Sequence, residues 1–291
     1  MAVEVIADLE SWRRCLHGCR SDGKTVGLVP TMGSLHGGHM SLVRKAAAEC
    51  DVVALTDYVN PLQFGPAEDL AAYPRDLDRD CALAAEAGAT FVWAPTVDEM
   101  WPYGEPVTSV RVADLTDGLE GAARPGHFDG VTTIVCKLFA VSGPCRAYFG
   151  EKDFQQLAVV SRMVSDLRLP VIVVGCPIVR DPDGLALSSR NAYLDDSERA
   201  VAPRLYHSLL AGKRAVEEEG VADPGEVEQA IAAHLAAEPR FELDYAAVAD
   251  PGDLSRPFVV RAGEVRLLAA ARLGRARLID NMSATPPSAA Q

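Results

Sequence analysis

The sequence predicts an α/β protein with a parallel sheet that carries helices on both faces, followed by a smaller C-terminal α+β domain. Up to about residue 178, apolar runs of strand length alternate with amphipathic segments of helical length, a pattern typical of parallel sheets. Beyond that point, a long stretch rich in Ala, Glu and Arg precedes several short apolar runs, which indicates helices followed by antiparallel strands. We therefore expect a Rossmann-like domain over residues 1–178 and a second domain over residues 179–291.

The elements of the first domain are predicted from hydrophobic periodicity and from the residues that interrupt it. Helices are expected where apolar residues recur at helical spacing, over residues 5–18, 38–49, 76–87, 130–142 and 153–167. Strands are expected at the apolar runs 25–30, 51–59, 90–94, 146–149 and 170–176. Asn60-Pro61 ends the second of these strands, because proline has no N–H for a sheet ladder.

The second domain opens with a turn signal, Asp181-Pro182-Asp183-Gly184, which favours a hairpin. Two helices are expected within residues 195–237, and Pro239 ends that region. Short strands are expected at residues 241–249, 257–261, 264–271 and 275–280. The polar, Pro-containing tail at residues 284–291 is expected to be disordered.

The composition disfavours several classes of protein. The formal net charge of −13 argues against tight nucleic-acid binding, because such proteins use a basic face to neutralise phosphates. No apolar run reaches the roughly 18 residues that a membrane span needs, and the first residues lack the apolar core of a signal peptide. The seven cysteines are odd in number and scattered, so we expect free thiols. These features predict a cytoplasmic protein with neither nucleic acid nor membrane as a partner.

Residues 18–25 (GCRSDGKT) match the literal P-loop pattern GxxxxGK[ST]. A working P-loop needs a strand before it and a helix after it, so that the helix N-terminus faces the phosphates. Here a predicted helix comes first and an apolar strand follows. We therefore interpret Gly23 and Lys24 as an ordinary helix-to-strand turn.

Two histidines mark the strongest candidate site. The strand at 25–30 runs into residues 31–39 (TMGSLHGGH), and a helix begins close behind. His36 and His39 are three residues apart, so they lie on one helical face. The helix N-terminus offers N–H groups to phosphate, and imidazoles can donate to charge that develops during group transfer. Two alternatives stay open: the histidines only cap the helix, or they bind a metal ion, for which the HExxH carboxylate and a third ligand are not evident.

Further segments place polar side chains at turns or strand ends. Asn60 and Gln63 follow a predicted strand, and amides can orient a carboxylate or hydroxyl without adding charge. Cations and hydroxyls suited to phosphate recur downstream, at Arg124, His127, Lys152, Ser188, Ser189 and Arg190. Each segment alone is more often a turn or a cap, but their recurrence at strand-to-helix junctions favours a nucleotide site.

Seven motifs, in this order and spacing, closely resemble the pantothenate synthetase (pantoate–β-alanine ligase) family: PTMGSLHGGH, VNPLQFG, YPRDLDRD, RPGHFDGV, YFGEKDFQQL, DGLALSSRNAYL and ARLGRARLIDN. The similarity runs along nearly the whole chain and is strongest over residues 29–194. The two-histidine motif alone would indicate only the wider superfamily of nucleotidylyltransferases and class I aminoacyl-tRNA synthetases.

The resemblance implies an ATP-dependent ligase of pantothenate biosynthesis. (R)-Pantoate would attack the α-phosphate of ATP to give pantoyl-adenylate and pyrophosphate. β-Alanine would then take the acyl group and release AMP. The resemblance also implies Mg²⁺ bound with ATP, a homodimer formed through the N-terminal domain, and a C-terminal domain that acts as a lid.

The resemblance also assigns roles to residues. His39 would be the proton donor, His36 and Arg190 would bind phosphates, and Lys152 would stabilise the pentacoordinate phosphorus. The ATP-binding set comprises Met32, Gly33, Ser34, Leu35, His36, Gly37, Gly38, His39, Gly150, Glu151, Lys152, Asp153, Val179, Leu187, Ser188, Ser189 and Arg190. The contacts to pantoate and β-alanine fall on Gln63, Gln156, Asn60, Arg124 and His127. Asp80 is assigned as an outer Mg²⁺ partner.

Three positions depart from the family pattern. Gly37 stands where Glu is usual and Leu187 where Met is usual, and neither change removes a group that the chemistry needs. Asp57 stands in an otherwise apolar strand, so it either pairs with a cation or points into the site. Two other functions stay open: a nucleotidylyltransferase acting on a phosphorylated substrate, and an ATP-binding protein without activity.

Overall fold

The computed structural model of the chain describes residues 3–65, 70–71, 73–260 and 263–287. Its contacts divide the chain into two compact units. The first comprises Met1–Glu151 and Val159–Pro177, and the second comprises Lys152–Ala158 and Ile178–Gln291. The short segment Lys152–Ala158, which we expected in the first domain, therefore groups with the second.

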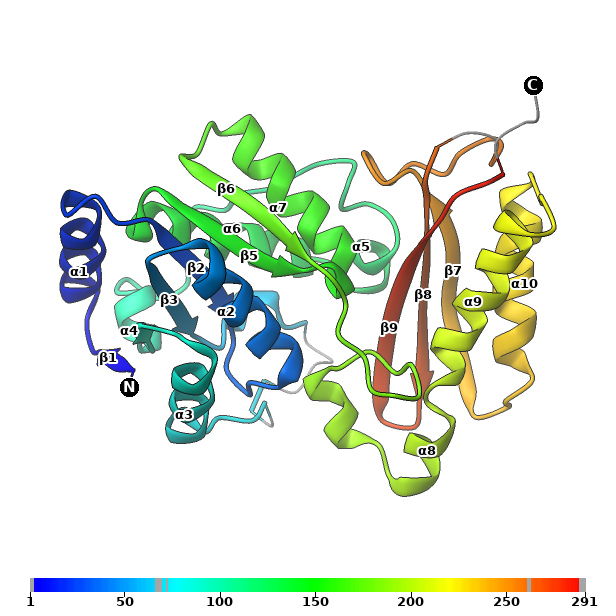
Figure 1. Ribbon diagram of the computed structural model, residues 1–291, viewed down its shortest axis with the longest axis horizontal. Helices are drawn as coiled ribbons and strands as arrows, with labels where there is room; N and C mark the ends of the chain where they lie inside the picture. The colour runs from blue at the N-terminus through cyan, green and yellow to red at the C-terminus, as the bar shows by residue number, and fades with distance from the viewer. Residues whose placement is uncertain (1–2, 66–69, 72, 261–262, 288–291) are drawn as a thin grey trace. The chain divides into compact units, whose positions relative to one another are not determined.

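A six-stranded parallel sheet forms the centre of the first unit (Figure 1). Its strands are β1 (Glu4–Ile6), β2 (Val26–Thr31), β3 (Val52–Asp57), β4 (Phe91–Trp93), β5 (Cys145–Gly150) and β6 (Val171–Cys176). They lie in the order β1-β4-β3-β2-β5-β6, so the winding direction reverses between β2 and β5. Sheets of this kind bind ligands at the carboxyl ends of the strands beside such a reversal.

The helices associated with this sheet are α1 (Leu9–Ser21), α2 (Gly37–Glu49), α3 (Leu77–Ala87), α4 (Val97–Met100), α5 (Glu120–Ala123), α6 (His127–Ser142) and α7 (Phe154–Asp166). Val92 of β4 packs in a buried cluster with residues of α2 and α3, whereas its neighbour Trp93 stacks on Trp12 of α1, with ring centroids 5.3 Å apart. Successive strand residues point to opposite faces, so α1 lies on the face opposite α2 and α3. Trp12 Nε1 donates to Ser142 Oγ of α6 (3.1 Å). Helices thus cover both faces, as predicted.

The second unit has the predicted α+β character. Its helices are α8 (Asp196–Val201), α9 (Arg204–Glu217) and α10 (Pro224–Ala236), and its antiparallel sheet, in the order β7-β8-β9, comprises β7 (Phe241–Ala249), β8 (Val265–Leu273) and β9 (Ala276–Ala284). Apolar residues of α9, α10 and β8, such as Leu209, Ile231 and Leu267, are fully buried in one shared core. The described residues also include three short 3-10 helices, η1 (Pro61–Gln63), η2 (Glu151–Asp153) and η3 (Ser189–Tyr193).

Several predicted boundaries were wrong. Residues 5 and 6 belong to β1 rather than to a helix over 5–18, because Asp8 accepts the N–H of Ser11 (2.8 Å) and so starts α1 at Leu9. The stretch 195–237 holds three helices instead of two. Residues 257–260 form no strand, and residue 261 of that prediction lies outside the described residues.

The prediction of disorder was wrong for the first residues of the tail. Ala284 ends β9 and is fully buried, and the N–H of Thr285 donates to Glu217 Oε1 (3.0 Å). The remainder of that prediction, from residue 288 on, lies outside the described residues.

The P-loop pattern at residues 18–25 spans the end of α1, a left-handed Gly23 (φ 76°) and the approach to β2, so the predicted helix-to-strand turn is confirmed. Among the helices of the described residues, none combines the length and the apolar character that crossing a membrane requires.

Candidate active site

The buried carboxylate of Asp80 stabilises the turn that follows β2. Gly33 and Ser34 have positive φ angles of 74° and 52°, so the backbone turns sharply at these two residues. Asp80, at the start of α3, accepts the N–H of Ser34 (2.7 Å) and the N–H of Leu35 (2.8 Å), one on each oxygen. Because Asp80 is only 1% exposed, these charge-assisted bonds fix the turn firmly.

Asp80 is the predicted outer partner of Mg²⁺, and in the structure both of its carboxylate oxygens accept backbone N–H groups. Among the described residues, no group of three His, Cys, Asp or Glu side chains is placed to hold a metal ion. Mg²⁺ often keeps several waters and binds mainly through substrate phosphates.

His36 is the N-cap of α2, so one alternative from the sequence, helix capping, is correct for this residue. Its Nδ1 accepts the N–H of Gly38 (3.1 Å), and the proton of the neutral ring must therefore sit on Nε2. The ring centroid of His39 lies 4.1 Å from that of His36. Capping and catalysis are thus compatible, since the cap orients His36 as a donor through Nε2. The described residues offer no support for a metal site here.

Asp57 ends β3 beside the same turn and faces a carboxylate instead of a cation. A side-chain carbon at Gly33 would overlap the Asp57 carboxyl group, which shows how closely the turn passes over it. Burial, with a further contribution from the nearby charge of Asp80, raises the pKa of Asp57 to about 6. Nothing in the structure explains why an acid stands at this position.

Asp57→Asn is expected to raise the melting temperature at pH 7–8 and to change it little at pH 4. The folded state binds the Asp57 proton more tightly than the unfolded chain does, so wild-type stability falls as the pH rises from about 4 through 6. The substitution removes that fall. The measurement is the difference between wild-type and variant melting curves across this range.

Asp51→Asn is the control of opposite sign. Hydrogen bonds from the Thr25 N–H and hydroxyl lower the pKa of Asp51, so its carboxylate stabilises the fold above about pH 4. This variant is expected to lower the melting temperature at neutral pH and to lose that effect in acid. An Asp57→Asn curve parallel to wild type would contradict the assignment.

The two predicted amides lie in a second cluster of the first unit, at η1. Asn60 is 1% exposed, and its Nδ2 donates to Gln63 Oε1 (3.1 Å) and to the carbonyl of Gly130 in α6 (3.1 Å). The Gln63 side chain is therefore oriented by Asn60. An amide held in this way can present its own N–H₂ to a ligand.

Arg124 belongs to the same cluster, to which His127 connects it. His127 Nδ1 lies 2.8 Å from the carbonyl of Gln63, and Arg124 Nη1 lies 2.9 Å from His127 Nε2. A carbonyl can only accept and a guanidinium can only donate, so His127 is neutral, with its proton on Nδ1. Asn60, Gln63, Arg124 and His127 thus form one connected set, although the chain separates the two pairs.

Because the resemblance assigns pantoate contacts to Asn60 and Gln63, Gly130→Ala is expected to weaken pantoate binding. An added methyl group at Gly130 would lie 2.6 Å from the N–H nitrogen of Gln63 and would overlap the carbonyl of Leu62, so η1 must move away from α6. Overpacking of this kind costs about 1–3 kcal/mol, and the KM for pantoate should rise about tenfold or more with a smaller change for ATP. Steady-state kinetics measure both values. Ala122→Gly, at an exposed position of α5, is the control and should leave both values unchanged.

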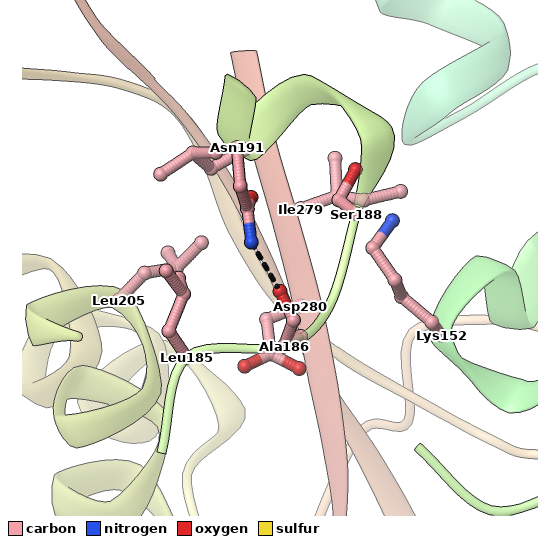
Figure 2. Close-up of a pocket in the computed structure, with 9 residues that line it drawn as sticks. Lys152, Leu185, Ala186, Ser188, Asn191, Leu205, Ile279 and Asp280 are labelled. Atoms are coloured by element: carbon pink, nitrogen blue, oxygen red, sulfur yellow. Dashed lines mark hydrogen bonds between the residues drawn. The ribbon is translucent and has the colours of Figure 1, made fainter. Parts of the chain in front are cut away.

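Two further predicted residues, Lys152 and Ser188, belong to the second unit and line a pocket of about 250 Å³ that includes space open to solvent. Figure 2 shows the Lys152 side chain extending into this pocket toward Ser188. The Lys152 side chain is 15% exposed and forms an ion pair with Asp153 at 3.6 Å. A half-buried ammonium and a hydroxyl on one wall suit an anionic group such as phosphate.

The segment that carries Ser188 is built by short-range contacts. The N–H of Leu187 donates to the carbonyl of Val179 (2.9 Å), and Ser188 Oγ caps η3 by accepting the N–H of Arg190 (3.3 Å). Val179 and the 187–190 segment, both predicted to bind ATP, are therefore adjacent. Ser189 and Arg190 lie in the first turn of η3.

Several other predicted residues lie at the ends of helices or strands. Gly37 and Gly38 open α2, and Gly150 ends β5 next to β2. Gln156 lies in α7 and is half-buried. Three residues with structural importance here were missed: Gly130, Asp280 and Asn281. The last two are adjacent polar residues that directly follow the apolar pair Leu278-Ile279, and that change was the available signal.

Comparisons with known proteins identify the relatives of this chain. A family model described as pantoate-beta-alanine ligase matches residues 4–283. The pantothenate synthetase of Roseiflexus sp. (strain RS-1) is 51% identical over 282 residues, covering 96% of this chain and 97% of the relative. That of Rhizobium johnstonii is 49% identical over 280 residues, covering 96% of this chain and 91% of the relative.

Solved structures give the same result. The crystal structure of pantothenate synthetase from Thermus thermophilus superposes with a TM-score of 0.91 at 48% identity, covering 98% of this chain and all of the other. The pantoate-beta-alanine ligase of Francisella tularensis, solved in complex with beta-gamma ATP and beta-alanine, superposes with a TM-score of 0.79 at 29% identity over 97% of each chain. The chain therefore belongs to the pantoate–β-alanine ligase family.

Proposed function

We propose that this chain catalyses the ATP-dependent condensation of (R)-pantoate with β-alanine to give pantothenate, AMP and pyrophosphate. Membership of the ligase family carries the proposal. Two features of the chain support it: the fixed turn with its paired histidines in the first unit, and the Lys152–Ser188 pocket in the second.

In the first step, a pantoate carboxylate oxygen forms a bond to the α-phosphorus of ATP, and the bond from that phosphorus to the bridging oxygen of pyrophosphate breaks. Pantoate is ionised near pH 7, so no serine or cysteine nucleophile is required. The step needs alignment and neutralisation of phosphoryl charge. We propose that His36 and His39, acting as N–H donors, and Lys152 and Arg190, acting as cations, supply this on one ATP molecule, with Mg²⁺ entering as MgATP.

In the second step, the neutral amine of β-alanine attacks the acyl carbon of pantoyl-adenylate. The C–N bond forms, the acyl C–O bond to AMP breaks, and the amine loses a proton. We propose that Gln63, oriented by Asn60, contacts both pantoate and β-alanine, with Gln156 as a second pantoate contact and Arg124 and His127 as accessory contacts. We also propose that residues 1–178 bind ATP and pantoate and that residues 179–291 act as a lid.

The deciding experiment is pantoate-dependent exchange of labelled pyrophosphate into ATP, without β-alanine, run against a panel of small hydroxy acids. Exchange with pantoate alone supports the proposal, because it requires reversible adenylate formation. Absence of exchange by folded protein would rule the function out. A nucleotidylyltransferase would instead build nucleotide into its product and release no AMP, and a silent ATP-binding protein would give neither signal.

The homodimer and the cytoplasmic location stay predictions. Size-exclusion chromatography with light scattering tests the first. Fractionation of the cells that produce the protein tests the second.

A further inference from the structure

The middle of strand β9 carries two buried polar residues that the proposed mechanism does not use. Asp280 is 4% exposed and Asn281 is 2% exposed. Buried polar groups normally have partners that justify their desolvation. Their hydrogen-bond partners Arg180, Arg266 and Lys152 lie within the second unit, and they lead to the Lys152 pocket.

Asn281 joins the backbone of Lys152 to a buried guanidinium. Its Oδ1 accepts from Arg266 Nε (2.7 Å), and its Nδ2 donates to the carbonyl of Lys152 (2.9 Å). The amide has only one orientation that satisfies both bonds, because Arg266 can only donate and the carbonyl can only accept. The carbonyl of Lys152 is therefore fixed to β9.

Arg266 also contacts Phe154, which lies two residues after Lys152. The side chain of Arg266 is 8% exposed, and its guanidinium carbon lies 4.1 Å from the ring centroid of Phe154. A desolvated cation over an aromatic face is attractive. Lys152 and Phe154, on either side of Asp153, are thus both attached to the β8–β9 pair, which limits rotation of the η2 backbone.

Asp280 extends this network to the opposite wall of the pocket. Its Oδ1 accepts the N–H of Asn281 (2.7 Å) and Arg180 Nη2 (2.9 Å), and its Oδ2 accepts Arg180 Nη1 (2.5 Å). Arg180 Nη1 also donates to the carbonyl of Gly184 (3.0 Å), just before the segment that lines the pocket with Ser188. Asp280 itself lines the pocket beside Lys152 (Figure 2).

We propose that Asn281 is a positioning residue for Lys152: through its bond to the Lys152 carbonyl it fixes the root of that side chain, so that the ammonium is held where phosphoryl charge develops. The proposal rests on the proposed function for the role of Lys152. A lysine side chain has four rotatable bonds, so a fixed backbone restricts where its ammonium lies. Displacement of a catalytic group by about 1 Å can cost about a hundredfold in rate.

Asn281→Asp tests the proposal with almost no change of volume. The variant keeps Oδ1 for Arg266 but replaces the donor that faces the Lys152 carbonyl with an acceptor, so that bond is lost. The kcat of pantoate-dependent pyrophosphate exchange should fall about 10- to 100-fold, while the KM for pantoate stays within about twofold of wild type. Arg266→Lys is a second variant, which keeps the charge but loses the Nε donor, and a smaller loss of kcat is expected.

A double-mutant cycle separates positioning from a merely structural role. If Asn281 acts through Lys152, combining Asn281→Asp with Lys152→Ala should give a kcat within about twofold of Lys152→Ala alone, because coupled residues are not additive. Losses that multiply would overturn the proposal. Leu273→Ala, which opens a cavity in β8 away from the pocket, is the control: it should lower the melting temperature and leave kcat unchanged.

The outcomes distinguish the two proposals. A wild-type protein without exchange activity would rule out the proposed function. An active wild type with an equally active Asn281→Asp variant would rule out the positioning role alone. If Asn281→Asp does not fold, the cycle with Arg266→Lys decides, and a kcat equal to wild type for that variant counts against the proposal.

Discussion

Lys152→Ala is expected to reduce the kcat of pantoate-dependent exchange about 10²- to 10³-fold, the range seen when a preorganised electrostatic group is removed. The ammonium would act on charge that develops at the phosphorus, so its loss should lower kcat more than it raises the KM for ATP. The thermal melt should change little. The Lys152 side chain forms its ion pair with Asp153, which is 44% exposed, and pairs with exposed partners contribute little to stability.

Lys213→Ala provides the matched control for this prediction. Lys213 lies in α9 of the same unit, donates to the carbonyl of Ser283 (2.9 Å) and pairs with Glu217 (2.8 Å). It does not line the pocket. The control should therefore keep wild-type kcat despite losing a similar ammonium. A Lys152→Ala protein that unfolds would show that Lys152 is structural, and a folded one that keeps full kcat would rule out its proposed role at the phosphorus.

The sequence predicted the repeating elements of the fold well and their ends less well. Apolar runs such as residues 52–56, all of them buried, are strands because both faces of a parallel sheet are buried. The error at β1 arose because Val5 and Ile6 continue the apolar spacing of α1, and only pairing with β4 makes them a strand. The absence of a strand at 257–260 has the same kind of cause, since apolar residues there, such as the exposed Phe258, have no partner strand within the described part of the chain.

The candidate site was predictable where its residues are close in the chain. His36 and His39, or Ser188 and Arg190, could be grouped from spacing alone, because a helix start or a tight turn brings them together. Asp280 and Asn281 were not assigned a role, because their partners are Arg180 and the Lys152 carbonyl, about a hundred or more residues away. Periodicity carries no information about such contacts.

Asp80→Ala is expected to lower both stability and ATP affinity. The variant leaves the N–H groups of Ser34 and Leu35 without their acceptors, and each unsatisfied buried donor costs about 1–3 kcal/mol. The turn after β2 would then lose the geometry that orients its N–H groups. Relief of the repulsion with Asp57 offsets only part of this cost. Thermal melts and the KM for ATP in the exchange assay measure the two effects.

Asp80→Asn and Asp78→Ala are the control variants with which Asp80→Ala is compared. Asp80→Asn keeps one acceptor oxygen and gains a donor that can face Asp57, so it should be less destabilised than Asp80→Ala. Asp78 lies in the same first turn of α3 but is exposed, and Asp78→Ala should match wild type. Since Asp80 supports the turn of residues 31–35 and not the Asn60–Gln63 cluster, its loss should raise the KM for ATP while sparing that for pantoate, the reverse of Gly130→Ala. Equal increases in both KM values would mean that Asp80 supports the whole sheet edge instead of this turn.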